Sequence, residues 1–223
     1  MTGKLLTELI GTFFLVLTIG LTVIVESPLA PLAIGSALMV MVYMGGHISG
    51  AHYNPAVTLA IWARGAMPAR EVGPYWIAQL LGSFLAAVAT WAITWETFAP
   101  APGDTATVLG AFLVEILFTL ALGLVVLETA TAPETKGNSF YGLAIGFTVA
   151  VGAFAGGGIS GGAFNPAVGL GPILFDGLAA GGTLSNAWLY VVAPVLGGLI
   201  AAGVYRIQRP GSPTLEQREE SRA

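Results

Sequence analysis

The chain has 223 residues, 55% of them hydrophobic and 9% charged, with a mean hydropathy of +0.81. Soluble domains carry roughly 25% charged residues, so a folded chain of this composition needs a lipid bilayer around its apolar surface. The net charge of −4 gives no basic surface for nucleic acid, and the absence of cysteine excludes disulfides, thiolate chemistry and cysteine-based metal sites.

Six stretches are apolar over about 20 residues, the length that a transmembrane helix needs. In chain order they cover residues 5–25, 31–50, 74–95, 108–127, 138–156 and 187–206. The connections between them are short, and we predict a single membrane domain over residues 1–207. Residues 208–223 are charged and poor in apolar side chains, and we predict that they form a disordered tail.

The basic residues indicate how these spans are oriented. With six spans, all eight fall at the two termini and in the connections after the second and fourth spans, which share one side of the membrane. They are Lys4, Arg64, Arg70, Lys136, Arg206, Arg209, Arg218 and Arg222. The positive-inside rule therefore predicts a multi-pass protein of the cell (inner or plasma) membrane with both termini and the tail in the cytoplasm.

The chain contains an internal repeat. A shift of 111 residues superposes 31–57 on 142–168 without a gap, with identical residues at 14 of 27 positions. Each copy ends in Ile-Ser-Gly-x-x-x-Asn-Pro-Ala-Val, at 48–57 and 159–168. Each half, about 5–95 and 108–206, holds three spans. Because three is odd, the second half enters from the opposite face, which predicts an inverted repeat.

Each motif also predicts the start of a short helix. Asparagine is a preferred N-cap, and proline suits the first helical position because its missing N–H is not needed there. The predicted helices run from 55 to about 64 and from 166 to about 175, half the length of a span. Entering from opposite faces, they are expected to meet near the middle of the bilayer.

Six spans with two Asn-Pro-Ala motifs resemble the aquaporin, or major intrinsic protein, family. The resemblance covers about residues 5–206 and implies an all-α membrane fold of six transmembrane helices plus two re-entrant half-helices. It also implies a passive channel without enzymatic activity, cofactor or metal. The implied assembly is a homotetramer in which each subunit has its own pore, with water, small neutral solutes and lipid as partners.

The paired motifs are expected to form a central constriction. Each half-helix places roughly half a positive charge at its N-terminus, so two facing ends repel cations, and the asparagine amides can donate hydrogen bonds to water. An N-cap without a pore is the competing interpretation of a single motif, but two matched copies favour the constriction. Its residues are Asn54, Pro55, Ala56, Asn165, Pro166 and Ala167.

The irregular segment before each asparagine is expected to offer acceptors, because free carbonyls at membrane depth are tolerated where they line a cavity. By resemblance, the pore carbonyls belong to Gly50, Ala51, His52, Tyr53, Gly161, Gly162, Ala163 and Phe164. Glu8 and Glu115 lie within apolar spans, where acids are functional or paired. The resemblance makes them supports of these segments, and a proton relay is the competing role.

The resemblance also implies an outer selectivity filter of four residues, here Ile34, Ala153, Gly162 and Val168. Family water channels carry arginine at the position of Val168 and histidine at that of Ala153. The filter is therefore expected to be wide and uncharged, admitting water with ammonia, hydrogen peroxide, urea and some glycerol. A dedicated glycerol channel is disfavoured, because Gly169 replaces that branch's aspartate and the filter has no aromatic wall.

Three alternatives remain open: a strict water channel, a coupled secondary transporter of a small neutral solute, and a structural membrane protein with a vestigial pore. A coupled transporter needs ionisable groups at the midplane, and the motifs offer amides instead. His47 and His52 could suggest a metal or pH-sensing pair. Their repeat equivalents are Gly158 and Ala163, which argues against that role.

Overall fold

A computed structural model of the protein describes residues 1–211, 214 and 217. Over these residues the chain is helical and contains no strand, in agreement with the predicted all-α class. The helices are α1 (Thr2–Ile24), α2 (Ala30–Gly45), α3 (Pro55–Ala63), α4 (Ala69–Thr94), α5 (Val108–Val126), α6 (Tyr141–Ser160), α7 (Pro166–Ala179) and α8 (Ala187–Gln208), with a π-helical turn η1 (Leu127–Thr131) and a 3₁₀ turn η2 (Pro133–Thr135).

Within the described part of the chain, five helices are long and apolar enough to cross a membrane: α1, α4, α5 continued by η1, α6 and α8. The sixth predicted span is α2, which has 16 residues. Its helical hydrogen bonding continues beyond Gly45, since the Ser49 N–H donates to the Gly45 carbonyl at 3.0 Å and the Gly50 N–H to the Gly46 carbonyl at 3.2 Å. The hydrogen-bonded turn after α2 therefore reaches residue 50, where the predicted span ends, whereas the helix itself ends at Gly45.

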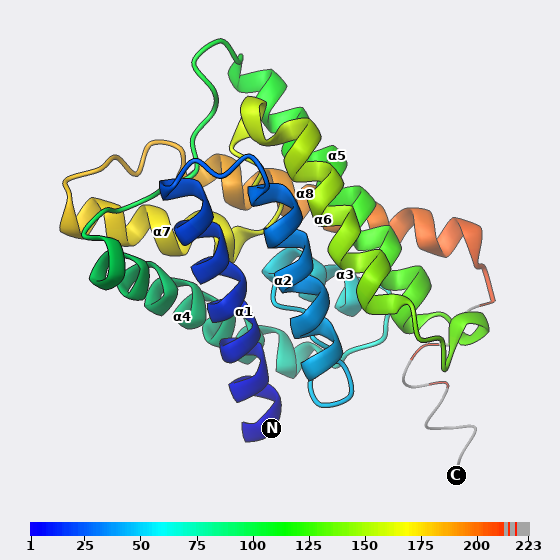
Figure 1. The fold of residues 1–223 in the computed structure, drawn as a ribbon. Helices are drawn as coiled ribbons and strands as arrows, with labels where there is room; N and C mark the ends of the chain where they lie inside the picture. The colour runs from blue at the N-terminus through cyan, green and yellow to red at the C-terminus, as the bar shows by residue number, and fades with distance from the viewer. Residues whose placement is uncertain (212–213, 215–216, 218–223) are drawn as a thin grey trace.

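The half-helices α3 and α7 have 9 and 14 residues. Helix α3 ends close to the predicted boundary, whereas α7 continues about one turn beyond residue 175 before the chain turns at Gly181 and Gly182. Each half-helix packs most extensively on a long helix of the other half, α3 on α8 and α7 on α4. The two halves of the chain are therefore interlocked through their half-helices (Figure 1).

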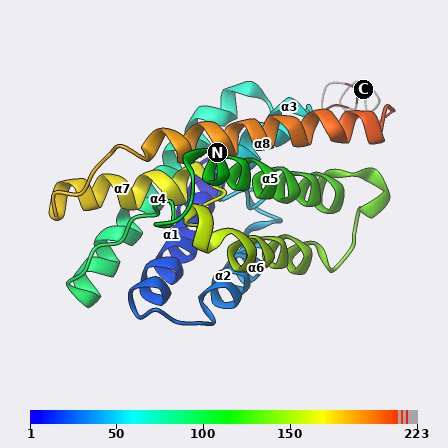
Figure 2. The same ribbon diagram turned by 90° about the horizontal axis from the view of Figure 1, so that it is seen from above.

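Glycines let the long helices pack closely. The most extensive helix contacts are α1 with α4, α5 with α8 and α2 with α6 (Figure 2). At the α2–α6 crossing a Cβ added to Gly35 would lie 2.6 Å from the Gly146 carbonyl oxygen, and Gly146 is equally blocked by the Gly35 carbonyl. Gly82 on α4 and Gly197 on α8 likewise face carbonyl oxygens of α1 and α5. Small residues at such crossings are typical of helices packed in membranes.

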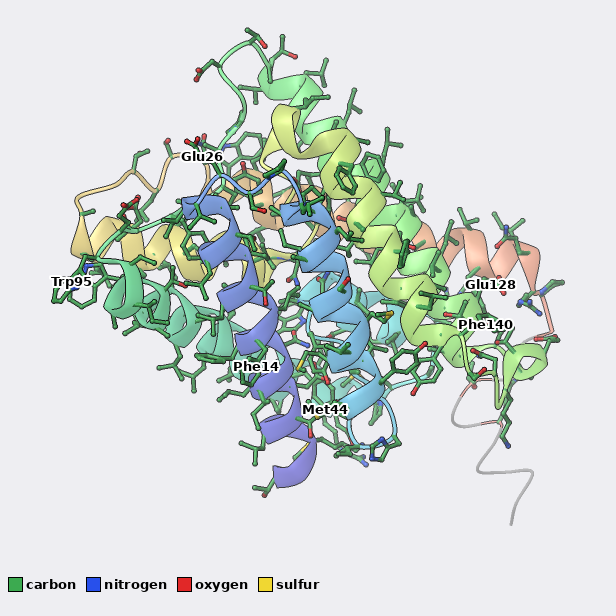
Figure 3. All side chains as sticks on the ribbon, in the orientation of Figure 1. Phe14, Glu26, Met44, Trp95, Glu128 and Phe140 are labelled. Atoms are coloured by element: carbon green, nitrogen blue, oxygen red, sulfur yellow. The ribbon has the colours of Figure 1, made fainter. Side chains whose placement is uncertain are left out.

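Polar bonds tie together one end of the bundle, where the N-terminus lies (Figure 1). The bonds are Lys4 to Glu71 at 3.0 Å, Arg64 to Thr131 at 3.1 Å, Arg209 to Glu128 at 2.6 Å, and Arg206 to the Ala63 carbonyl. Glu128 and Phe140 lie toward this side, and Glu26 and Trp95 toward the other (Figure 3). The regions that carry the described basic residues therefore meet at one end of the molecule.

The predicted tail begins within α8, which extends through Gln208. Of residues 208–223 the structure describes 208–211, 214 and 217, and the prediction of disorder for the other positions lies outside the described residues.

Candidate functional site

The site is built from the starts of the two half-helices. Asn54 and Asn165 have extended backbone conformations and act as N-caps. The Asn54 Oδ1 accepts from the Ala56 N–H at 2.8 Å and the Val57 N–H at 3.4 Å, and the Asn165 Oδ1 accepts from the Ala167 N–H at 2.9 Å. These bonds satisfy helix N–H groups that would otherwise lack an acceptor.

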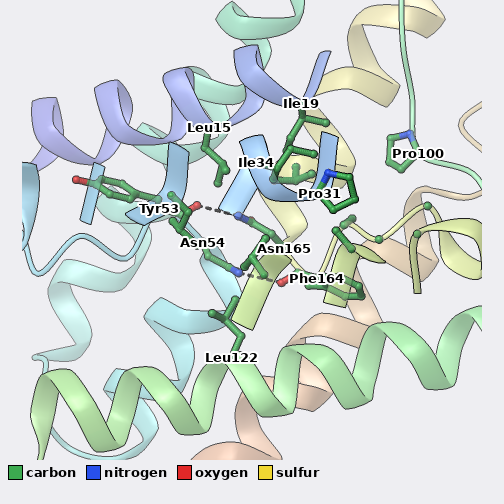
Figure 4. A pocket seen from close by; sticks show the side chains of 18 of the residues that line it. Leu15, Ile19, Pro31, Ile34, Tyr53, Asn54, Pro100, Leu122, Phe164 and Asn165 are labelled. Atoms are coloured by element: carbon green, nitrogen blue, oxygen red, sulfur yellow. Dashed lines mark hydrogen bonds between the residues drawn. The ribbon is translucent and has the colours of Figure 1, made fainter. Parts of the chain in front are cut away.

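The same two asparagines connect the halves of the chain. The Asn54 Nδ2 donates to the Phe164 carbonyl at 2.9 Å, and the Asn165 Nδ2 donates to the Tyr53 carbonyl at 2.8 Å (Figure 4). Each carbonyl belongs to the residue directly before the other asparagine. The sequence predicts that these amides donate to water, and the structure shows that one N–H of each amide instead binds a backbone carbonyl. Because an amide has two N–H donors and one is used here, each asparagine retains one.

The segments before the asparagines have matching backbone conformations. Gly50, Ala51 and Tyr53 have φ values of +90°, +52° and +47°, and the equivalent positions 161, 162 and 164 have +86°, +65° and +50°. Alanine, tyrosine and phenylalanine rarely adopt positive φ, so the surrounding structure must hold these segments in place. The Tyr53 and Phe164 carbonyls each accept one asparagine bond and keep a second lone pair.

Glu8 holds the first segment. Its Oε1 accepts from the Ser49 hydroxyl at 2.6 Å and the His52 N–H at 3.0 Å, while its Oε2 accepts from the Tyr53 N–H at 2.7 Å. The Gln79 side chain on α4 donates a fourth bond to Oε2 at 2.7 Å. The carboxylate is fully buried, and these donors compensate for its lost hydration.

Glu115 holds the second segment in the same way. Its Oε1 accepts from the Ser160 hydroxyl at 2.7 Å and the Ala163 N–H at 3.0 Å, and its Oε2 accepts from the Phe164 N–H at 2.6 Å. It is as fully buried as Glu8. The geometry thus brings both predicted acids to the backbone of the irregular segments.

Sequence reasoning missed two tyrosines that complete this support. The Tyr75 hydroxyl donates to the Ser49 carbonyl at 2.7 Å, and the Tyr190 hydroxyl donates to the Ser160 carbonyl. Both are buried. Their separation is 190 − 75 = 115 residues, so they fall outside the gap-free repeat of 111. The sequence could have indicated both residues, because each lies inside an apolar span (74–95 or 187–206) and a buried tyrosine hydroxyl needs a hydrogen-bond partner.

An outer cavity of about 490 Å³ opens beside the asparagine pair (Figure 4). All four residues predicted for the filter border it: Ile34, Ala153, Gly162 and Val168. Helix α1 contributes Leu15, Ile19 and Val23, and the α4–α5 connection contributes residues 98–101, none of which sequence reasoning included. The side chains on this wall are uncharged and mostly apolar, and Asn54 and Asn165 are among the polar residues that border the cavity.

A second, inner cavity of about 1110 Å³ lies at the end that carries the basic residues. Lys4, Arg70 and Lys136 border it, and His52 and Ile145 border both cavities. The two cavities therefore approach each other at His52 and Ile145.

The structure places the two histidines at the boundary of the inner cavity. The His52 ring is buried, with its Nδ1 3.1 Å from the Thr58 hydroxyl, and His47 borders the inner cavity. Among residues 1–211, 214 and 217, no group of three or more His, Cys, Asp or Glu side chains could hold a metal ion. The arrangement therefore offers a small molecule two asparagine amides as hydrogen-bond donors, between two cavities.

Comparison with known proteins agrees with this geometry. The sequence model of the family described as "Major intrinsic protein" matches residues 1–205. The chain is 36% identical over 216 residues to Aquaporin NIP1-1 of Zea mays, covering 92% of this chain and 74% of that protein. It is 35% identical over 228 residues to Nodulin-26 of Glycine max, covering 98% and 82%. Glycerol uptake facilitator protein-like 6 of Lactiplantibacillus plantarum is 36% identical over 218 residues, covering 92% and 97%.

The fold has a solved counterpart. The X-ray structure of the aquaglyceroporin from Plasmodium falciparum matches with a TM-score of 0.82 at 24% sequence identity, over 92% of this chain and 95% of that chain. The inverted pair of half-helices, the multi-pass apolar helices and the family match lead to one conclusion. The chain belongs to the major intrinsic protein family, whose members are passive membrane channels for water or small solutes and not enzymes.

Proposed function

We propose that this channel conducts water and small neutral solutes along a path between Asn54 and Asn165, from the outer to the inner cavity. The observation that carries the proposal is the reciprocal bonding of the two asparagine amides, both of which border the outer cavity. Each amide keeps one N–H for a passing molecule. A water or a urea can accept that bond and donate to a carbonyl of the adjoining segments.

The half-helix ends give the proposed path its charge selectivity. Helices α3 and α7 begin at these asparagines, and each N-terminus is equivalent to roughly half a positive charge. Two such ends at one place raise the energy of a cation there, hydronium included. Among the described residues, none that borders the outer cavity is acidic, and the buried carboxylates of Glu8 and Glu115 accept hydrogen bonds from the loop backbone. The proposed solutes are therefore neutral.

The proposed filter sets which neutral solutes pass. Ile34, Ala153, Gly162 and Val168 all border the outer cavity and carry no charge and no side-chain donor. A wide, apolar mouth of this kind favours ammonia, hydrogen peroxide, urea and small polyols alongside water. A relative whose printed name includes glycerol uptake supports passage of solutes larger than water.

The arrangement in the membrane is also part of the proposal. We place both termini and the inner cavity in the cytoplasm of a cell membrane, because the described basic residues gather at that end. Family membership supports a homotetramer with one pore per subunit. Protease access to an epitope at the N-terminus in right-side-out vesicles tests the first point, and native mass measurement in detergent tests the second.

A solute panel on reconstituted protein tests the filter. Stopped-flow light scattering on proteoliposomes measures water, urea and glycerol fluxes for the wild type, Val168→Arg and the uncharged control Val168→Leu. We expect arginine to reduce urea and glycerol flux by about tenfold or more, the effect of one poorly fitting group in a binding pocket, and to spare water. Leucine should reduce them less.

Unchanged urea flux in Val168→Arg, with water flux intact, would remove Val168 from the filter. Wild-type flux of water alone would favour a strict water channel. Flux that depends on a sodium or proton gradient would indicate a coupled transporter, and absence of all flux would indicate a vestigial pore.

A further inference from the structure

The α4–α5 connection carries an aromatic side chain into the outer cavity. Residues 98–101 border the cavity, and Phe98 contributes a ring that the four filter positions lack. The other aromatic residues on the cavity wall are Tyr53 and Phe164, which are buried in the segments before the asparagines. Phe98 is half-buried and borders the cavity.

Helix α1 provides a closely packed surface for the Phe98 ring. A Cβ added to Gly20 would lie 2.5 Å from the Phe98 ring and 2.6 Å from the Thr90 hydroxyl, so the ring rests directly on the α1 backbone. Ile19 and Val23, on the same helix, border the cavity beside it. A larger residue at position 20 would push the ring out of this place.

The connection is also fastened to the second half of the chain on both sides of Phe98. The neighbouring Thr97 hydroxyl donates to the Asp176 carboxylate on α7 at 2.5 Å. Further along, the Gly103 N–H donates to the Ile159 carbonyl at 3.1 Å, at the end of α6. These two bonds fix the position of the connection on both sides of Phe98.

We propose that Phe98 is a fifth size-determining residue of the outer mouth and supplies the aromatic wall that the four-residue filter does not contain. The ring faces the same space as Ile34 and Val168, so it narrows the opening on the side of α1. It offers an apolar surface to the carbon skeleton of a short polyol, while the carbonyls of the second irregular segment are available to the hydroxyls. The inference depends on the proposed channel function and specifies its solute class.

A size series tests the role of Phe98. Water, urea, glycerol and erythritol fluxes are measured in proteoliposomes carrying the wild type, Phe98→Ala, Phe98→Trp and Thr97→Val. Phe98→Ala should raise erythritol flux relative to water by about tenfold, since a missing apolar group in a pocket changes discrimination by that order. Phe98→Trp should lower glycerol and erythritol flux and leave water flux unchanged.

Thr97→Val removes the bond to Asp176 and keeps the ring, and it should raise the erythritol to water ratio by less than Phe98→Ala. The matched control is Phe14→Ala on α1. This phenylalanine is 46% exposed on the surface of the helix bundle and does not border the cavity. Its flux ratios should equal those of the wild type.

Solute ratios that stay the same in both Phe98→Ala and Phe98→Trp, in a protein that conducts urea, would overturn the role of Phe98 alone. A wild type that conducts no solute would overturn the proposed channel function instead. If Phe98→Ala fails to fold, Phe98→Trp and Thr97→Val provide the test, because both variants keep an aromatic ring at position 98.

Discussion

Glu8 and Glu115 occupy equivalent places in the two halves, yet Glu8 accepts one hydrogen bond more. Both accept one serine hydroxyl and two backbone N–H groups, and Glu8 also accepts from Gln79. The residue of the second half that corresponds to Gln79 is Pro194, when α8 is matched to α4 through Tyr75 and Tyr190. The first irregular segment is therefore tied to α4 through an additional side chain.

This difference predicts unequal effects of glutamine substitution. In Glu8→Gln an N–H₂ group replaces one of the two carboxylate oxygens. Replacement of Oε2 leaves the Tyr53 N–H and the Gln79 amide without their acceptor, and replacement of Oε1 does the same to the Ser49 hydroxyl and the His52 N–H. Hydrogen bonds to charged groups contribute about 1.5–3 kcal/mol each, so both Glu8→Gln and Glu115→Gln should destabilise the protein, and Glu8→Gln should do so more. Thermal unfolding in detergent provides the comparison.

The matched control is Glu96→Gln, an exposed acid in the α4–α5 connection, which should unfold at the wild-type temperature. If the Glu115→Gln protein were less stable than the Glu8→Gln protein, the stabilising role of the hydrogen bond from Gln79 to Glu8 would be contradicted.

The α2–α6 crossing predicts a second stability effect. Gly35→Ala places a methyl group 2.6 Å from the Gly146 carbonyl oxygen, and both partners are backbone. The helices must separate, and overpacking of this kind costs about 1–3 kcal/mol. In Gly203→Ala the new methyl group meets no atom within 4 Å, so this control on α8 should be neutral or gain from the better helix propensity of alanine. Equal unfolding temperatures for the two variants would refute the close crossing.

The facing helix ends predict a change in ion selectivity. Asn165→Asp retains an oxygen to cap α7 and introduces a fixed negative charge where two helix N-termini meet. A full charge exceeds the half charge at each N-terminus, so the barrier to cations should fall and sodium flux should appear. Radiotracer sodium uptake into proteoliposomes measures it. The uncharged variant Asn165→Ala should stay impermeable to sodium, and sodium uptake equal in both variants would show that the charge is not the cause.

Much of the fold could be predicted from local signals. The apolar spans, the Asn-Pro starts of α3 and α7, and the repeat that relates 31–57 to 142–168 lie in contiguous sequence. Glu8 and Glu115 could be singled out because an acid inside an apolar span needs partners. The family match and the structure confirm the helical class and the paired half-helices.

What could not be predicted depends on how the two halves cross. The bond from Asn54 to the Phe164 carbonyl joins residues 110 positions apart, and no periodicity encodes that contact. Tyr75 and Tyr190 lie beyond the gap-free repeat, because the connections to α4 and α8 differ in length. Phe98 lies in a connection without regular structure, and its place depends on contacts with Gly20.

The central claim is that a water path runs past the asparagine pair, and the absence of native cysteine allows a direct test. Leu122 borders the outer cavity and lies close to the pair (Figure 4), whereas Leu117, on the same helix, is 57% exposed on the outer face. Water flux in proteoliposomes is measured for Leu122→Cys and Leu117→Cys before and after treatment with mercuric chloride. We predict that mercury blocks flux through Leu122→Cys, that a thiol reductant restores it, and that Leu117→Cys and the wild type are unaffected. Flux through folded Leu122→Cys that mercury leaves unchanged, or a block in Leu117→Cys instead, would contradict a path between Asn54 and Asn165.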